Sequence, residues 1–229
     1  MNRLLLSTAV LFFVGAQAGT VFQPETAYNP AQLLPPPPAD GSAENKAEMN
    51  ELQTLQRDSS AAEYAHAKED GEAESVMAFA GVMGPGFDLK ALPKTAALFA
   101  DLRKEEKDAA KRAKNYFQRN RPWVLESSLK TCTRNDDPKS SYPSGHATMG
   151  YSFAVVLAAL VPEKAPAIMA RAADYANSRL ICAVHYRSDI VAGQVLGTAV
   201  AVELFSVPKF KAEFDAARAE LHSARLAAN

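Results

Sequence analysis

The distribution of apolar and polar positions predicts helices along most of the chain and no β-strands. Residues 43–70 are rich in Ala, Glu, Gln, Leu and Lys and contain neither proline nor glycine, so they favour a helix. A shorter apolar segment at 75–83 is followed by the turn signal Gly84-Pro85-Gly86. No segment shows the strict alternation that would indicate a half-buried strand.

Further helices are expected after this turn, over residues 92–102, 104–119, 146–160, 165–180, 188–205 and 209–226. The helix at 104–119 is expected to end before Arg121, because the residue that precedes a proline is disfavoured in a helix. Residues 123–143 are predicted to form a polar connection. Small residues in the segment 188–205 would let another helix approach closely: Ala192, Gly193, Gly197 and Ala201. The pattern predicts an all-α, single-domain helical bundle.

The first residues have the features of a secretory signal peptide. Arg3 precedes the apolar run Leu4–Val14, and the sequence Ala-Gln-Ala ends at Ala18. The run is shorter than the roughly 20 apolar residues that a membrane span requires, and no comparable run occurs later. We therefore expect cleavage after Ala18 and export of a soluble protein to a bacterial periplasm.

The predicted leader divides the chain into three parts. Residues 1–18 form the signal peptide, residues 19–44 a proline-rich N-terminal segment, and residues 45–229 the helical domain. For a chain of 229 residues, a single folded domain is the simplest expectation.

Net charge and cysteine content restrict the functions that the chain can have. The net charge of -1 gives no electrostatic reason to expect binding to nucleic acid or to an anionic membrane, so any anion must be bound by a local cluster. Cys132 and Cys182 can form a disulfide in an exported chain, and the alternative is two buried free thiols. We favour the disulfide because both cysteines flank polar clusters in a compartment where such bonds persist.

The first two polar clusters suggest an anion site. Lys114 and Arg121 are seven residues apart, which can place both on one face of a helix. Pro143 and Gly145 shape a tight turn at the start of an apolar helix, where unsatisfied N–H groups can hold an anion. Ser144 in this turn could instead serve only as an N-cap.

The third cluster lies in an otherwise apolar stretch. Arg179, His185 and Asp189 would be costly to bury unless they are paired or functional. A partly exposed helix with a salt bridge is the simpler interpretation of this cluster alone. Asp189, four residues after His185, can hold one imidazole nitrogen and leave the other free to attack, as in a catalytic triad.

Together the clusters contain what phosphoryl transfer needs. They supply cations for the phosphate oxygens, a nucleophile with an orienting partner, and an acid for the leaving oxygen. A metal site built from His146, His185 and Asp189 is chemically conceivable, but the nearby arginines would repel a cation. His66 and His222 lie in polar helical surroundings and are expected at the surface.

The order of these motifs resembles a known family. The chain contains Lys-x6-Arg-Pro, then Pro-Ser-Gly-His, then Ser-Arg-x5-His-x3-Asp. This pattern resembles that of the phosphatidic acid phosphatase type 2 superfamily, which includes the vanadium-dependent haloperoxidases. The leader, Leu33-Leu34 before four prolines, Ser141-Tyr142 and the cysteine placement look like the class A bacterial nonspecific acid phosphatases. The resemblance implies a helical bundle of the acid phosphatase/vanadium haloperoxidase type and hydrolysis of small phosphate monoesters at acidic pH.

The resemblance also implies a role for each site residue. His185 would attack phosphorus and form a phosphohistidine, Asp189 would orient it, and His146 would protonate the leaving group and then activate water. The phosphate oxygens would be bound by Lys114, Arg121, Ser144, Gly145 and Arg179. No metal or other cofactor is implied.

Three alternatives differ in function class. A haloperoxidase would use bound vanadate in the same pocket, and a non-catalytic periplasmic phosphate-binding protein would not need His146 and His185 on opposite sides of the anion. A membrane-embedded lipid phosphatase is disfavoured by the missing spans. The sequence leaves open the physiological substrate, the balance between hydrolysis and phosphotransfer to alcohols, and the formation of a homo-oligomer.

Overall fold

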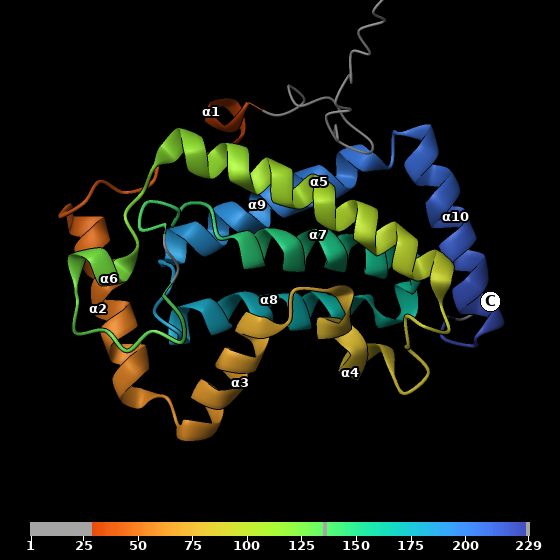
Figure 1. Ribbon diagram of the computed structural model, residues 1–229, viewed down its shortest axis with the longest axis horizontal. Coiled ribbons are helices and arrows are strands. Elements are labelled where there is room, and N and C mark those ends of the chain that lie inside the picture. Colours follow the sequence, from red (N-terminus) through yellow and green to blue (C-terminus); the bar gives the residue numbers. More distant parts are fainter. Residues whose placement is uncertain (1–28, 135–136, 228–229) are drawn as a thin grey trace, which may run out of the picture.

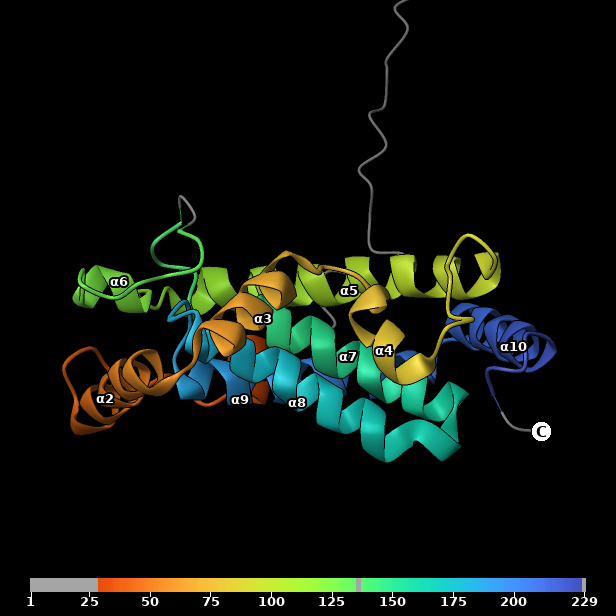
Figure 2. The ribbon, with the colours of Figure 1, turned by 90° about the horizontal axis from the view of Figure 1, so that it is seen from below.

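The computed structural model describes residues 29–134 and 137–227, and this part of the chain contains helices but no strand. The predicted all-α class is therefore confirmed. Helix α7 (Gly145–Leu160) is apolar on every face and lies between α5 (Pro93–Phe117) and α8 (Ala165–Ile181), as Figure 1 shows. Helix α9 (Arg187–Leu204) packs against α7, and α10 (Pro208–Ser223) crosses one end of the elongated bundle (Figure 2).

Shorter helices cover the bundle. They are α1 (Pro30–Leu33), α2 (Ala43–Asp58), α3 (Ala61–Glu72), η1 (Val76–Phe79), α4 (Ala80–Met83), α6 (Pro122–Leu125) and η2 (Pro162–Lys164). Helix α3 packs on α8, and α2 lies at the end of the bundle where α9 begins (Figures 1 and 2).

The single helix predicted over 43–70 is wrong, because the chain breaks between α2 and α3. Ser60 caps α3 by accepting a hydrogen bond from the Glu63 N–H, and the Glu63 carboxylate accepts one from the Ser60 N–H. This reciprocal capping box starts a new helix. Its sequence signal is Ser-x-x-Glu, which lies inside an otherwise uniform helical composition.

The two helices predicted over 92–102 and 104–119 form one continuous helix, α5. It starts with Pro93 at its first position, where a missing N–H costs nothing. It ends at Phe117 because Gln118 adopts a left-handed conformation, with φ 51° and ψ 39°. The connection predicted after it contains one short helix, α6.

The small residues of α9 allow the close approach that the sequence predicts. A Cβ on Gly197 would lie 2.2 Å from the Thr148 carbonyl oxygen, and a Cβ on Gly193 would lie 2.7 Å from the Ser144 carbonyl oxygen. Both contacts are with α7 or its N-cap, so only glycine lets the start of α9 lie against the start of α7.

The predicted disulfide is confirmed between Cys132 and Cys182, and it joins the connection after α6 to the residue that follows α8. The predicted signal peptide and its cleavage after Ala18 lie outside the described residues. In the proline-rich segment, the Pro35 carbonyl accepts a 2.7 Å hydrogen bond from the Tyr142 hydroxyl.

No single helix of the described chain is long and apolar enough to cross a membrane. Helices α9 and α10 meet that criterion only as a pair, and they are bent by 93° at their junction.

Candidate active site

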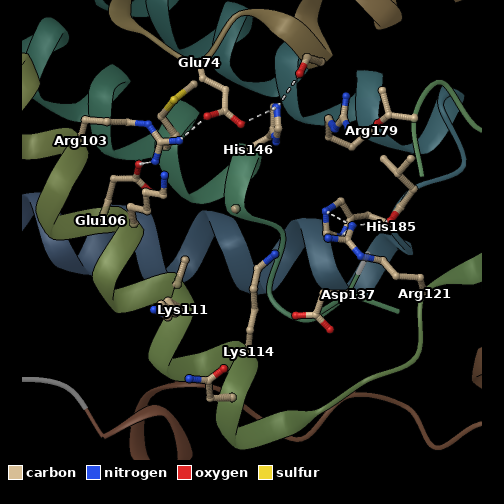
Figure 3. Close-up of a pocket in the computed structure, with 18 of the residues that line it drawn as sticks. Glu74, Arg103, Glu106, Lys111, Lys114, Arg121, Asp137, His146, Arg179 and His185 are labelled. Carbon is tan, nitrogen blue, oxygen red and sulfur yellow. Dashed lines mark hydrogen bonds and ion pairs between the residues drawn. The ribbon is translucent and has the colours of Figure 1, made fainter. Parts of the chain in front are cut away.

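Four helix ends converge at one end of the bundle and line a cavity of about 450 Å³. The C-terminal end of α5 brings Lys114, and the N-terminus of α7 brings Gly145 and His146. The last turn of α8 brings Arg179, and the turn before α9 brings His185. With Arg121 from the loop after α5, these residues surround the cavity (Figure 3). The structure therefore brings the three sequence clusters together.

His185 contacts Asp189, the residue that the sequence pairs with it. The Nδ1 atom of His185 lies 3.3 Å from Oδ2 of Asp189, and both side chains are buried. Because a carboxylate only accepts hydrogen bonds, Nδ1 carries the proton and the lone pair is on Nε2. The Nε2 atom lies 2.8 Å from Nη1 of Arg121, which lines the same cavity.

The charge around His185 keeps it neutral. Burial lowers its pKa well below the usual 6.5, and the cations Arg121, Lys114 and Arg179 lower it further. A neutral imidazole is the form that can act as a nucleophile, and in this structure its Nε2 lone pair accepts the hydrogen bond from Nη1 of Arg121.

His146 lies on the same cavity, from the first turn of α7. Its Nε2 atom is 3.0 Å from the carbonyl oxygen of Gly71, which can only accept, so Nε2 carries a proton and Nδ1 is the other titrating atom. Burial, followed by the charge of Arg179, lowers the pKa of His146 to about 3. The ring is stacked on Tyr175 of α8, with centroids 5.8 Å apart.

Lys114, Arg121 and Arg179 make the cavity strongly cationic. Burial, followed by the charge of Arg121, lowers the pKa of Lys114 to about 7. Burial lowers the pKa of Arg121 to about 10. Arg179 is buried, and its Nε and Nη1 atoms have no hydrogen-bond partner among the described residues. Buried donors without an acceptor are costly, so a bound anion would satisfy them.

Ser144 and Asp189 lie behind the cavity wall. The Ser144 hydroxyl accepts a 3.3 Å hydrogen bond from the Ala147 N–H, so it acts as the N-cap of α7. The Ser144 N–H donates to the Asp189 carbonyl at 2.9 Å, which ties the start of α7 to the start of α9. The capping role that the sequence left open for Ser144 is therefore present.

Arg119 is a buried site residue that the sequence reasoning missed. Its Nη1 atom lies 2.7 Å from Oδ1 of Asp189, and its Nη2 atom lies 2.7 Å from Glu48 of α2. Its guanidinium also lies over the Tyr186 ring, 4.1 Å from the centroid. The sequence did contain a signal for this role. Arg119 lies two residues before Arg121, after the end of α5, and alternate residues of an extended chain lie on the same side.

A second missed group forms the wall of the cavity farther from His185. Gly71 and Glu74 come from the end of α3 and the turn after it, and Arg103 and Glu106 come from α5 (Figure 3). A Cβ on Gly71 would lie 2.3 Å from Nη1 of Arg179, so the end of α3 lies directly against this arginine. Nothing in the local sequence at α3 indicates this contact.

Other polar residues in this region and at the surface lie at the edge of the cavity or away from it. Asp137, in the connection after α6, is exposed and lines the cavity, and Asp136 lies outside the described residues. Arg187 pairs with Glu51 and so ties α9 to α2. His66 is half exposed, as predicted, whereas His222 is partly buried.

Comparison with known proteins agrees with the geometry. A sequence profile described as the PAP2 superfamily matches residues 107–213. An acid phosphatase from Zymomonas mobilis is 31% identical over 218 residues, which cover 90% of this chain and 82% of that protein. The chain belongs to the PAP2 superfamily. The superfamily match includes every site residue from Lys114 to Asp189.

Two further relatives carry a more specific name. A non-specific acid phosphatase from Providencia stuartii is 33% identical over 196 residues, covering 82% of this chain and 79% of its own length. One from Salmonella typhimurium is 30% identical over 207 residues, covering 87% and 82% respectively. All three of these relatives are therefore named acid phosphatases.

Proposed function

We propose that this acid phosphatase hydrolyses phosphate monoesters through a covalent phosphohistidine on His185. The Nε2 lone pair of His185 attacks phosphorus as the bond to the leaving oxygen breaks. His146 donates a proton from Nδ1 to that oxygen and so releases an alcohol. In the second step, His146 Nδ1 takes a proton from a water that attacks phosphorus, which frees His185 and inorganic phosphate.

The observation that carries this proposal is the pairing of two imidazoles with a buried arginine that lacks acceptors. A site that only bound phosphate could use the Arg179 donors, but it would gain nothing from an oriented nucleophile at His185 or from a second histidine on the same cavity. Lys114, Arg121 and the Gly145 N–H would complete the binding of the phosphate oxygens. Charge development on these oxygens in the transition state is what such fixed donors stabilise.

The electrostatics of the site favour activity at acidic pH. The lowered pKa of His185 keeps the nucleophile unprotonated well below the usual 6.5. The pKa of Lys114, about 7, means that this residue carries its full charge only below neutral pH. The two shifts define an acidic window in which the nucleophile is neutral and the phosphate site is cationic. A bound phosphate anion raises the pKa of His146 and so supplies the general acid with its proton.

The proposal is tested by trapping the intermediate. After incubation with a radioactive monoester and an alkaline denaturing quench, which preserves acid-labile phosphohistidine, His185→Ala should contain no labelled phosphoenzyme, and its turnover should be abolished. His146→Ala should turn over roughly 10²–10⁴ times more slowly than wild type, the usual contribution of a general acid or base. The loss of rate should be smallest with substrates whose leaving group needs no proton. A labelled His185→Ala protein would contradict the assignment of the nucleophile.

The three cations should replace a metal ion in this site. Activity with p-nitrophenyl phosphate should survive exhaustive EDTA treatment, and vanadate should inhibit as an analogue of the five-coordinate transition state. We further propose export to the periplasm after cleavage at Ala18, and phosphate transfer to alcohols that compete with water in the second step. Peroxide-dependent halide oxidation by the vanadate-loaded protein would instead favour the haloperoxidase alternative.

A further inference from the structure

Glu74 lies between His146 and Arg103 on the cavity wall. Its Oε1 atom is 3.9 Å from Nε2 of His146, and its Oε2 atom is 2.9 Å from Nη2 of Arg103 (Figure 3). The nitrogen that Glu74 faces is the one that donates to the Gly71 carbonyl. A carboxylate and a carbonyl therefore share the Nε2–H edge of the imidazole, and Nδ1 remains for the substrate.

An ion pair with Arg103 holds the Glu74 side chain in this position. Its side chain is 53% exposed, so alone it would move freely in solvent. Arg103 joins it to Glu106, whose carboxylate is fully buried beneath the cavity wall. Glu106 and Arg103 lie on α5, and Glu74 lies in the turn after α3. The contacts from Glu106 through Arg103 therefore hold Glu74 where it faces His146.

The other charged groups facing His146 oppose its protonation, whereas the hydrogen bond to the Gly71 carbonyl favours it by raising the pKa. Arg179 lies on α8, Lys114 and Arg103 lie on α5, and each of these cations disfavours a positive imidazole. The neutral partners in contact with the ring are Tyr175, by stacking, and the Gly71 carbonyl. His185 adds no negative charge. Among the described residues near the ring, Glu74 supplies the carboxylate in ion-pairing range.

We propose that Glu74, held by Arg103 and Glu106, is a positioning residue that stabilises the imidazolium form of His146. This inference rests on the proposed function, since it matters only if His146 acts as the acid. With the proton held on the ring, Nδ1 can pass it to the leaving oxygen as that oxygen takes the electron pair of the P–O bond. The water used in the second step then returns a proton to Nδ1, so the cycle balances.

The rate of phosphoenzyme formation at saturating substrate tests the proposal. Glu74→Gln keeps the shape but removes the charge, and with an alkyl phosphate it should slow this step roughly fivefold, the effect of about 1 kcal/mol from a part-exposed ion pair. The alkaline limb of the rate, where the general acid loses its proton, should move to lower pH. With p-nitrophenyl phosphate, whose leaving group needs little proton assistance, the rate should change far less.

Two matched variants separate this role from a structural one. Glu72→Gln removes an exposed carboxylate two residues away that does not line the cavity, and it should behave as wild type. Arg103→Lys keeps the positive charge near His146 but loses the guanidinium fork that joins Glu74 to Glu106, so it should shift the alkaline limb in the same direction as Glu74→Gln. Each variant is compared at matched folded fraction, measured by thermal unfolding.

An unchanged alkaline limb in Glu74→Gln, or an equal loss with both substrates, would overturn the role of Glu74. The proposed function is judged separately from wild type and His146→Ala. If His146→Ala loses no more activity with alkyl phosphates than with p-nitrophenyl phosphate, the general acid itself is wrong. If His146→Ala behaves as expected and Glu74→Gln does not, only the present inference fails.

Discussion

At the scale of single residues, Asp189 shows how much structure serves the orientation of one imidazole. Its carboxylate accepts hydrogen bonds from the Ser141 hydroxyl at 2.5 Å, the Tyr186 N–H at 2.9 Å and Arg119 at 2.7 Å, besides facing His185. A buried carboxylate that accepts this many hydrogen bonds is fixed in one orientation. Asp189 therefore holds the His185 ring in one tautomer and one direction.

Arg119 should be needed for rate more than for substrate binding. Arg119→Met removes the charged partner of Asp189 without touching the phosphate site, so kcat should fall about 10- to 100-fold through misplacement of His185, while KM changes little. Arg187→Met, which removes an arginine from a half-exposed pair with Glu51, is the control and should leave kcat near wild type. Steady-state kinetics decide this, and equal losses in both variants would show that Arg119 is merely structural.

The two active-site histidines should make the protein less stable in acid. Each has a folded-state pKa below the usual 6.5, that of His146 being about 3, so the unfolded chain binds more protons between those values. Stability is then fully present above about pH 6.5 and falls as the pH drops, by about 1.4 kcal/mol per pH unit for each histidine.

Replacing one of these histidines should weaken the dependence of stability on pH. In His146→Gln, the slope of the free energy of unfolding against pH should be smaller between pH 6 and pH 4 by the contribution of one proton. Urea unfolding at several pH values measures this slope. Saturating phosphate should stabilise wild type more than this variant at low pH, because the bound anion favours the protonated ring. An identical slope in both proteins would mean that His146 is protonated in the folded state without substrate.

At the scale of elements, the site exists because four helix termini meet. The turn from α8 to α9 illustrates the local solution: the Val184 N–H bonds to the Arg179 carbonyl at 3.1 Å, and the Ala183 N–H bonds to Leu180 at 2.8 Å. This is a Schellman ending, with Ala183 in the left-handed region at φ 48°. It reverses the chain within a few residues, so that Arg179 and His185 line the same cavity.

Close packing of α9 on α7 should depend on Gly197. A Cβ there would overlap the Thr148 carbonyl at 2.2 Å and approach the Ser152 nitrogen at 3.0 Å, and neither backbone atom can yield easily. Gly197→Ala should therefore destabilise the protein by about 1–3 kcal/mol, although alanine is the better helix former. Gly81→Ala in α4 meets nothing within 4 Å and is the matched control.

The two glycine variants should shift the midpoint of thermal unfolding in different directions. Gly197→Ala should lower it by several degrees, at about 2–4 °C per kcal/mol for a domain of this size. Gly81→Ala should leave it unchanged or raise it slightly. A neutral Gly197→Ala variant would show that α7 and α9 can separate without cost.

The sequence predicted those parts of the site that are encoded locally. His185 and Asp189 are four residues apart across the start of α9, and Ser144 to His146 form the start of α7, so their closeness in sequence predicts that they meet. Helix positions followed from composition, apart from the break at Ser60, where a capping box overrides propensity. The predicted boundary near Leu102 was wrong because no helix-breaking residue stands there.

What the sequence could not predict are contacts between distant segments. Gly71 and Glu74 reach His146 only because α3 folds back over α8. The position of α3 depends on Asp70, which pairs with Arg171 and accepts a 2.7 Å hydrogen bond from Ser178. These pairings join residues about one hundred positions apart, and nothing in the local pattern selects one partner over another.

At the scale of the whole molecule, the active-site end of the bundle is closed by covalent and ionic ties. The disulfide joins the connection after α6 to the end of α8, and the Cys132 N–H also bonds to the Cys182 carbonyl at 3.3 Å. Thr133, next to Cys132, lines the cavity, and Arg179 lies three residues before Cys182. The bond therefore links one wall of the cavity to the segment that carries His185, the proposed nucleophile.

Reduction of this disulfide should lower stability before it lowers activity. The cysteines are 50 residues apart. For a loop of about that length the chain-entropy model gives roughly 4 kcal/mol, an upper figure because residual structure in the unfolded chain reduces it. Thermal unfolding with and without reductant should show a clear drop in the midpoint. Turnover at room temperature should persist, since no step of the proposed chemistry uses sulfur.

Thiol titration of the denatured, unreduced protein checks the bond itself. We expect no reactive thiol per chain, whereas two would refute the disulfide while leaving the phosphatase assignment intact. The double variant Cys132→Ser with Cys182→Ala should unfold like the reduced protein, and the single variants should do no better, because each leaves the loop open. If the double variant matched the oxidised wild type in stability, the ion pairs that join α2 and α3 to α8 and α9 would suffice to hold the site closed.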